Sequence, residues 1–181
     1  MGFTKVISAW PATGKSTLAL QYPIMNYSEL QHYGFDLADW IKDLDSAVYK
    51  AHFSEPDWVN GYMCMIKAFY QQGYEDGGRT MLLVSSHNQV QERLVNAQIP
   101  FTVVMPTWNS QYEYIKSLGY RALRSQSPGD EAAYKYMEAN FKTAYRQAIE
   151  LQKAHKGLVS LIKLDTRTTH LTNIYDQLWE G

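Results

Sequence analysis

The segment that most constrains this chain is residues 9–17, which read Ala-Trp-Pro-Ala-Thr-Gly-Lys-Ser-Thr and follow directly on an apolar run over residues 3–9. An apolar run, a short loop and a helix-forming stretch in this order are typical of a strand–loop–helix unit. A loop that ends in Gly-Lys-Ser at the start of a helix turns its backbone N–H groups toward a phosphate. The segment therefore predicts a phosphate-binding loop, or P-loop.

Three residues of this loop have separate roles in that prediction. Gly14 lies closest to the phosphates, Lys15 reaches the outer phosphates, and Ser16 offers its hydroxyl to Mg²⁺. The usual pattern has Gly at its first position, where this chain has Ala9. The alternative is an ordinary strand–turn–helix in which Gly-Lys-Ser occurs by chance. We expect ATP and Mg²⁺ as cofactors, with the nucleotide held by Ala12, Thr13, Gly14, Lys15, Ser16 and Thr17.

Composition limits the fold and the partners. A chain of 181 residues with 45% hydrophobic content is expected to form one domain over residues 1–181. Its formal net charge of −1 gives no support for a large nucleic-acid footprint, although local basic patches stay open. Cys64 is the single cysteine, and its apolar neighbours favour a buried thiol in a reducing cytoplasm. No apolar run has the length of a membrane span, and we expect no membrane partner.

Strand-like and helix-like stretches alternate along the chain. This alternation predicts an α/β fold with a mostly parallel sheet flanked by helices in three layers. The expected strands cover residues 3–9, 24–28, 81–86, 101–105 and 159–164. The expected helices cover residues 36–50, 55–72, 109–118, 130–154 and 169–179, with a further helix after Asn88 and a loop over residues 119–129.

Four blocks of residues together suggest a family. They are residues 7–17, 81–87 (Met-Leu-Leu-Val-Ser-Ser-His), 99–106 (Ile-Pro-Phe-Thr-Val-Val-Met-Pro) and 113–121 (Glu-Tyr-Ile-Lys-Ser-Leu-Gly-Tyr-Arg). The combination resembles small P-loop kinase-like proteins common in bacteriophage genomes, which are similar to nucleoside and nucleotide monophosphate kinases of the adenylate kinase type. The resemblance implies a P-loop NTPase fold and ATP-dependent phosphoryl transfer in the cytoplasm, that of the host if a phage encodes the chain.

Phosphoryl transfer needs cations on the migrating charge as well as the loop itself. Arg121 and Arg124 lie three residues apart in a segment with Gly and Pro, and a lid over about 117–130 would carry both onto the phosphates. Solvated surface arginines are the alternative. By analogy with such kinases, Arg167 in the loop after the last strand borders the adenine of ATP or merely caps the sheet.

The acceptor side is less sharply marked. Ser86 and His87 follow the strand at 81–86, where α/β proteins place ligand contacts, so we expect them to bind the substrate. No Asp ends that strand, so the usual second magnesium-binding carboxylate is missing there. Glu29 and Asp36 follow the expected second strand, in the region that meets the acceptor, and Asp36 is the candidate base. Such charges are equally typical of a solvated helix face.

The function expected from these observations is ATP-dependent phosphoryl transfer to a nucleotide or nucleoside, with deoxynucleoside monophosphates as the leading substrate class. One alternative is a kinase for a modified pyrimidine, free or in DNA. Another is a nucleotide-binding interaction protein without transfer activity. The identity of the acceptor and the oligomeric state stay open.

Overall fold

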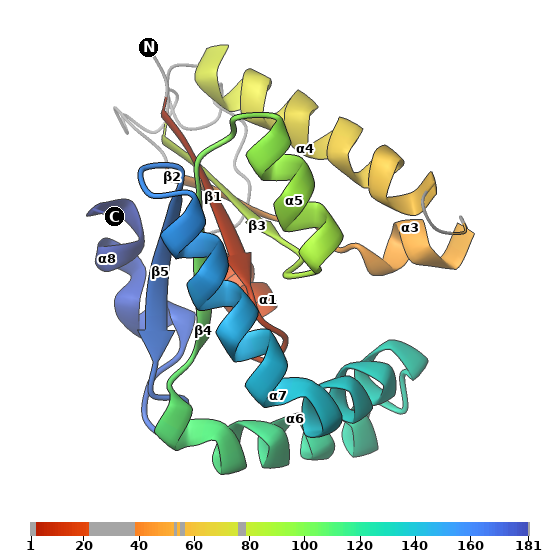
Figure 1. The fold of residues 1–181 in the computed structure, drawn as a ribbon. Coiled ribbons are helices and arrows are strands. Elements are labelled where there is room, and N and C mark those ends of the chain that lie inside the picture. The colour runs from red at the N-terminus through yellow and green to blue at the C-terminus, as the bar shows by residue number, and fades with distance from the viewer. Residues whose placement is uncertain (1–2, 22–38, 53, 55–56, 76–78, 181) are drawn as a thin grey trace.

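The computed structural model describes residues 3–21, 39–52, 54, 57–75 and 79–180. Strands and helices alternate along these residues (Figure 1). The strands are β1 (Phe3–Ala9), β2 (Asp39–Asp43), β3 (Arg79–Val84), β4 (Phe101–Pro106) and β5 (Val159–Leu164). The helices are α1 (Lys15–Gln21), α3 (Ala47–His52), α4 (Asp57–Glu75), α5 (Asn88–Asn96), α6 (Gln111–Ser125), α7 (Pro128–Ala154) and α8 (Tyr175–Glu180), with short 3-10 helices η1 (Trp108–Ser110) and η2 (Leu171–Ile174).

The five strands form one parallel sheet in the order β2-β3-β1-β4-β5. In the register of its centre, Val6 of β1 lies beside Leu82 of β3 on one side and beside Phe101 of β4 on the other. Because all strands run in the same direction, the loops that follow them gather at one edge of the sheet. The loop between β1 and α1 leaves the central strand at that edge.

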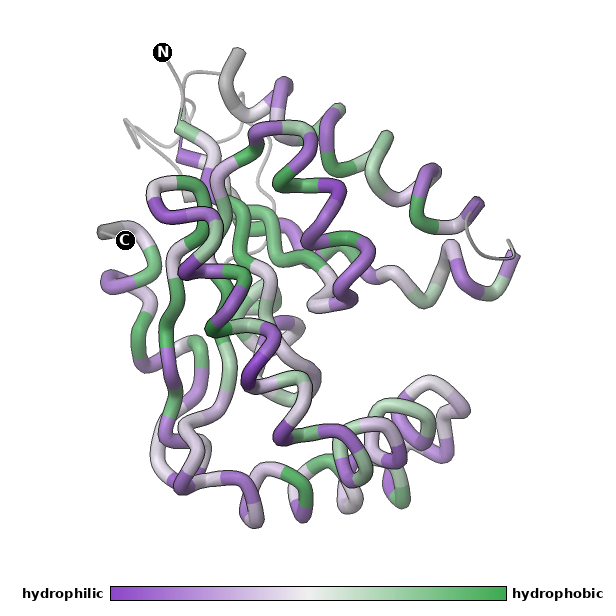
Figure 2. The backbone as a smooth tube through the Cα atoms, viewed as in Figure 1, coloured by the Kyte–Doolittle hydropathy of each residue, from purple (hydrophilic) through white to green (hydrophobic). Residues whose placement is uncertain are grey.

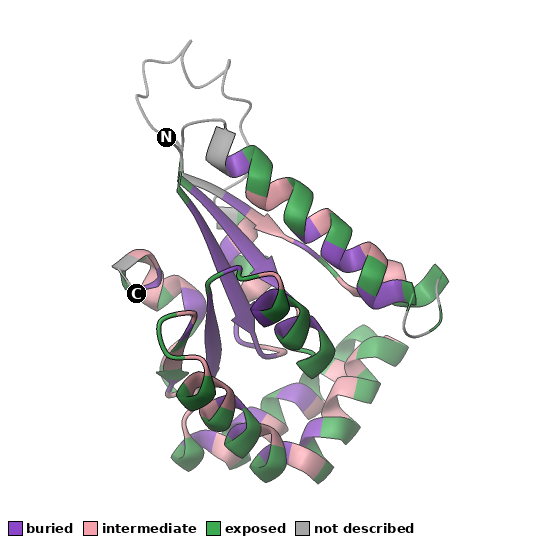
Figure 3. Ribbon diagram, turned by 45° about the horizontal axis from the view of Figure 1, so that its top comes forward, coloured by how far each residue is buried: buried purple, intermediate pink, exposed green. Residues whose placement is uncertain are grey.

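Helices cover both faces of the sheet, which gives the three-layer α/β architecture that the sequence predicts. On one face, Val6 and Leu82 belong to a core with Trp58 of α4, Leu94 of α5 and Phe141 of α7. On the other face, a second core joins sheet residues to α1, η2 and α8, through Ile7, Leu18, Leu83, Leu171 and Leu178. The three central strands β3, β1 and β4 are correspondingly apolar (Figure 2) and largely buried (Figure 3), whereas the edge strand β5 is buried only at Val159 and Leu164.

The helix expected over residues 36–50 is wrong for residues 39–46 and confirmed for residues 47–50, while residues 36–38 lie outside the description. Residues 39–43 form β2, which pairs with β3 so that Ile41 lies beside Met81, and α3 begins only at Ala47. The expectation rested on apolar residues at helical spacing, but the open edge of β3 pairs with this segment, and tertiary pairing overrides a local pattern. The strand expected at 24–28 lies outside the described residues.

The loop expected over residues 119–129 is also wrong for most of its length. Helix α6 continues through Gly119 to Ser125, and α7 begins at Pro128. A Cβ atom at residue 119 would lie 3.3 Å from the Tyr134 ring of α7, so Gly119 serves close packing of the two helices rather than a turn. The two helices form a hairpin beyond the carboxyl edge of the sheet (Figure 1).

Cys64 is exposed, which corrects the expectation of a buried thiol. It lies on α4 away from the face that buries Trp58, Tyr62 and Ile66, because successive helical residues point about 100° apart. Among the residues that the structure describes, no helix has the length and apolar character needed to cross a membrane.

Candidate functional site

The loop between β1 and α1 has a strained, defined backbone. Gly14 has a φ angle of 102° and Ala12 one of 57°, both in the left-handed region that favours glycine. Ala9, by contrast, is the last residue of β1 and is buried, so the first position of the motif needs no glycine here. The Thr13 hydroxyl donates to the Trp10 carbonyl at 2.7 Å, and the Thr13 carbonyl accepts from the Leu171 N–H at 3.0 Å. These bonds hold the loop in its curve.

Lys15 is the first residue of α1, and its ammonium lies within this curve. Nζ donates to the Ala9 carbonyl at 2.7 Å and to the Trp10 carbonyl at 3.4 Å. Burial lowers the pKa of Lys15 from 10.5 to about 8, against the opposing effect of the Asp43 carboxylate. Arg121 lowers the pKa further, so the guanidinium acts on the Lys15 ammonium. Groups of both signs therefore lie at the carboxyl edge of the central strand, with Lys15 and Arg121 on one side and the carboxylates of Asp43 and Asp45 on the other.

A carboxylate that sequence reasoning missed lies beside Ser16. The Ser16 hydroxyl donates to Oδ2 of Asp43 at 2.9 Å, and Asp43 is the last residue of β2. Asp43 escaped notice because its segment was expected to be helical. The sequence does contain a signal, because Asp45 and Ser46 are residue types that favour the start of a helix, which places the residues before them outside it. In the structure, the Asp45 carboxylate accepts the Ala47 N–H at 2.8 Å where α3 begins.

Ser16 and Asp43 together fit one side of a magnesium site. Hydroxyl and carboxylate oxygens are ligands that Mg²⁺ prefers, and Mg²⁺ in phosphate sites takes few protein ligands. Within the described part of the chain, no group of three or more His, Cys, Asp or Glu side chains is arranged to hold a metal by itself. Ser16 and Asp43 therefore fit a cation whose other ligands would be phosphate oxygens and water.

The two arginines of the expected lid have different surroundings in the structure. Arg121 of α6 forms an ion pair with Asp130 of α7, 2.9 Å from Nε to Oδ1, and it acts on the Lys15 ammonium. Arg124 lies almost one turn further along α6 and is exposed. The same helix packs against the β1–α1 loop, because the rings of Tyr114 and Trp10 lie 6.0 Å apart. Arg121 therefore lies on a helix that contacts the β1–α1 loop directly.

Buried polar contacts connect the ends of β2 and β3. The Tyr62 hydroxyl donates to the Leu44 carbonyl at 2.6 Å and accepts from the Ser85 N–H at 2.9 Å. Burial raises the pKa of Tyr62 far above its ordinary value of 10, so the hydroxyl stays protonated. Ser86 and His87, the two residues expected to bind substrate, lie in the loop that starts at this fixed point. Ser86 is half-buried and His87 is exposed.

The remaining predicted residues lie apart from this centre or outside the description. Arg167 follows β5, and its guanidinium pairs with Asp165, with Nε 2.7 Å from Oδ1. The pair lowers the pKa of the Asp165 carboxyl through the hydrogen bond. Thr17 is exposed on α1. Glu29 and Asp36 lie outside the described residues.

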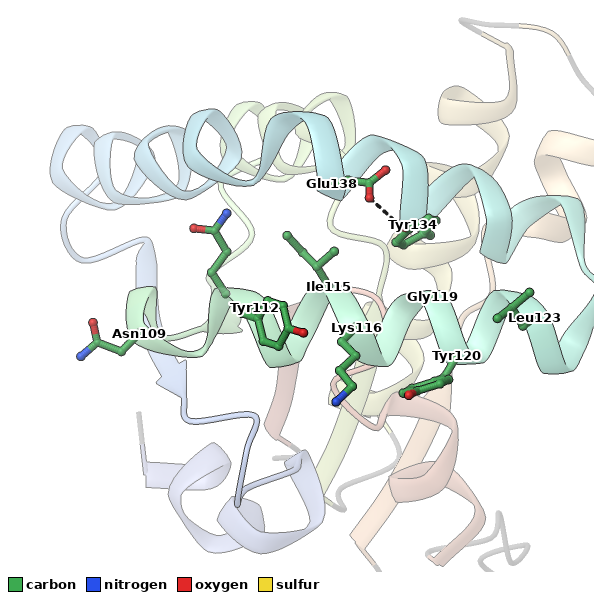
Figure 4. Close-up of a pocket in the computed structure, with 10 residues that line it drawn as sticks. Asn109, Tyr112, Ile115, Lys116, Gly119, Tyr120, Leu123, Tyr134 and Glu138 are labelled. Carbon is green, nitrogen blue, oxygen red and sulfur yellow. Dashed lines mark hydrogen bonds between the residues drawn. The ribbon is translucent and has the colours of Figure 1, made fainter.

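A groove of about 660 Å³ lies between α6 and α7 (Figure 4). Its lining includes Tyr112, Lys116 and Tyr120 of α6 and Tyr134 of α7. None of the residues predicted from the sequence to bind nucleotide or substrate lines this groove. The candidate site is thus the carboxyl edge of the sheet and not this groove. At that edge the charged side chains of Lys15 and Asp43 lie beside the left-handed backbone of Ala12 and Gly14.

A comparison with known families and with curated proteins finds no family model that matches the chain and no significantly similar curated sequence.

Proposed function

We propose that this chain is a P-loop kinase, which uses ATP and Mg²⁺ to phosphorylate a nucleotide or nucleoside. The observation that carries the proposal is the contact between Ser16 and Asp43 at 2.9 Å, beside Lys15 and the left-handed Gly14. A hydroxyl, a carboxylate, a cation and a loop of backbone N–H groups at the start of a helix are the parts that phosphoryl transfer needs. The family resemblance stated above supports the same reading.

The loop binds and orients the phosphates of ATP. Backbone N–H groups around Gly14 point at phosphate oxygens, and the positive end of the α1 dipole adds to their effect. Lys15 exchanges its bonds to the Ala9 and Trp10 carbonyls for bonds to phosphate oxygens. A bound phosphate raises the pKa of Lys15 again, because it places negative charge next to the ammonium.

Asp43 has two roles open to it in this reaction. Ser16 and Asp43 would hold Mg²⁺, directly or through water, and the ion would neutralise negative charge on the phosphates. If the acceptor is a hydroxyl, the Asp43 carboxylate also accepts the proton that the hydroxyl loses. An acceptor phosphate needs no base, because its oxygen is already anionic. Asp43 therefore takes the place of Asp36 as our candidate acceptor-side acid.

Arg121 supplies the further cation. The Arg121 guanidinium lies near enough to the loop to lower the pKa of Lys15, and it forms an ion pair with Asp130 of α7. An arginine that approaches the migrating phosphoryl group stabilises the charge on its equatorial oxygens. Arg124 and Arg167 are secondary candidates, for the phosphates and the adenine respectively.

Deoxynucleoside monophosphates are the leading acceptors, and modified pyrimidines, free or in DNA, are the second. The interaction-protein alternative relied on a missing carboxylate at the site. Asp43 supplies a carboxylate at the end of β2, but none follows β3, so this alternative stays open and the experiment below decides between transfer and binding alone.

The test is an ATP-consumption screen against deoxynucleoside monophosphates, nucleosides and DNA, run on the wild type and on Lys15→Ala. We expect turnover with at least one acceptor class and a loss of about 100-fold or more in Lys15→Ala, because the ammonium stabilises transition-state charge. Lys153→Ala, at an exposed position in the last turn of α7, is the matched control and keeps wild-type turnover. Turnover by folded Lys15→Ala at the wild-type rate contradicts the proposal.

A further inference from the structure

A cluster of polar side chains lies on the β2–β3 side of the candidate site. Nζ of Lys50 is 2.8 Å from Nε2 of His87, and Oγ of Ser85 is 3.0 Å from Nδ1 of the same ring. Lys50 belongs to α3, whereas Ser85 and His87 lie between the end of β3 and the start of α5.

The contacts define how the imidazole is protonated. An ammonium has only donors, so Nε2 of His87 accepts from Lys50. The proton of the neutral ring then lies on Nδ1, which donates to Oγ of Ser85. The Trp58 ring packs against both side chains. The Lys50 ammonium lies 4.8 Å from the centroid of the Trp58 ring, and the His87 ring packs edge-on against Trp58 with 5.3 Å between the ring centroids. The cluster is thus ordered rather than a chance meeting of surface side chains.

The cluster is tied to the reacting centre. The Tyr62 hydroxyl bridges the Leu44 carbonyl and the Ser85 N–H, so the residue after Asp43 and the residue that contacts His87 are held by one buried group. The distance between Asp43 and the cluster is therefore fixed by the fold.

We propose that Lys50, His87 and Ser85 form a second anion site, which binds a phosphate group of the acceptor while the acceptor's hydroxyl lies at Asp43. The Lys50 and His87 side chains are exposed. Lys50 supplies ammonium donors and Ser85 supplies a hydroxyl donor, while the His87 ring lies between the two groups and positions them. His87 is the N-cap of α5 and its side chain makes no capping bond, so the positive end of this nine-residue helix faces the same position.

The inference rests on the proposed kinase function and narrows its substrate class. The acceptor is a nucleotide that keeps its own phosphate as a handle, and the group that receives the phosphoryl is a different one, a hydroxyl. A free nucleoside lacks the handle. The phosphate can be the monoester of a mononucleotide or the diester of an oligonucleotide, which offer the same anionic oxygens.

The experiment measures binding of thymidine, the four deoxynucleoside 5′-monophosphates and the dinucleotide d(TpT). It is carried out by calorimetry with saturating Mg²⁺ and a non-hydrolysable ATP analogue. We expect at least one phosphate-bearing probe to bind about tenfold or more tightly than thymidine, in line with one or two charge-assisted hydrogen bonds. Tighter binding of monophosphates identifies a mononucleotide acceptor, and tighter binding of d(TpT) identifies a strand.

Lys50→Gln and His87→Gln should each remove most of that advantage and leave thymidine binding unchanged. Lys67→Gln, at an exposed lysine of α4, is the matched control and should retain the advantage. The His87 imidazole resonances in NMR spectra should shift with the phosphate-bearing probe and stay in place with thymidine. This readout requires no turnover.

Two failures are distinguishable. If the ATP analogue does not bind, the kinase function is wrong, whatever the cluster does. If the analogue binds but Lys50→Gln and His87→Gln bind every phosphate-bearing probe as the wild type does, or no such probe shifts the His87 resonances, the second anion site is overturned and the kinase function stands.

Discussion

The Ser16 hydroxyl and the Asp43 carboxylate lie 2.9 Å apart, although 26 residues separate them in the chain between positions 16 and 43. The contact joins the first turn of α1 to the end of β2. It provides the carboxylate that no residue at the end of β3 supplies.

Replacement of Asp43 by Asn should lower kcat by a factor of about 100 to 10,000, because an amide neither accepts a proton nor matches a carboxylate as a magnesium ligand. Steady-state ATP consumption measures the effect. Asp176→Asn removes an exposed carboxylate from the first turn of α8 and should leave kcat unchanged. An Asp43→Asn enzyme with wild-type kcat would remove Asp43 from the reaction.

The depressed pKa of Lys15 predicts two opposite pH effects. In the free enzyme, kcat/KM for ATP should fall as pH rises through about 8, where the ammonium loses its proton. The free energy of unfolding should rise between about pH 8 and 10.5, because the unfolded chain binds the proton more tightly than the folded one over that window. Urea unfolding of the wild type and of Lys15→Met checks the second effect, and the difference between the two curves should be flat below pH 8. A difference that stays flat to pH 10.5 contradicts the depressed pKa.

Gly14→Ala should destabilise the protein and abolish tight ATP binding. The added Cβ has room, 3.5 Å from the Cβ of His170, so the cost comes from the φ angle of 102° and is about 1–2 kcal/mol. Gly157→Ala is a matched control, since its φ angle is 89° and its Cβ meets nothing within 4 Å. We expect a similar loss of stability in thermal unfolding, with unchanged affinity for ATP. Loss of ATP binding in both variants would mean that ATP binding depends on overall stability and not on the backbone conformation of residue 14.

Tyr62→Phe should lower the free energy of unfolding by about 2–3 kcal/mol, since it leaves the buried Leu44 carbonyl and Ser85 N–H without their shared partner. It should also raise KM for the acceptor more than KM for ATP, because the ends of β2 and β3 are no longer held together. Tyr112→Phe changes a hydroxyl on a residue that is 73% exposed and should alter neither quantity. Equal changes in both KM values would show that Tyr62 acts on stability alone.

The two arginines of α6 should differ in effect. Arg121→Ala is expected to lower kcat by a factor of about 100 or more, because we propose Arg121 as the cation on the migrating phosphoryl group. Arg124→Ala should change kcat less, and ATP affinity should change little in either variant. Single-turnover measurements separate transfer from product release. The reverse order of effects would assign the transition-state cation to Arg124.

The sequence by itself determined the architecture wherever the signal is local. Apolar runs are typical of the strands of a parallel sheet, so strands near residues 3–9, 81–86, 101–105 and 159–164 were identifiable, although β3 ends at Val84 and β5 is only partly buried. Gly14, Lys15 and Ser16 were identifiable because one short loop contains them all. The same local reasoning failed for β2, which is a strand because β3 offers it an open edge, and for Gly119, which serves helix packing rather than a turn.

Only the tertiary structure decided what surrounds the loop. Asp43 reaches Ser16 because β2 lies in the sheet with its carboxyl end at the same edge as that of β1, a placement set by strand order and not by nearby residues. Lys50 meets His87 for the same reason, across 37 residues of chain. Sequence patterns report which face of an element is apolar, whereas the neighbours of a polar side chain depend on how distant elements pack. The loop could therefore be predicted from the chain alone, and its carboxylate partner could not.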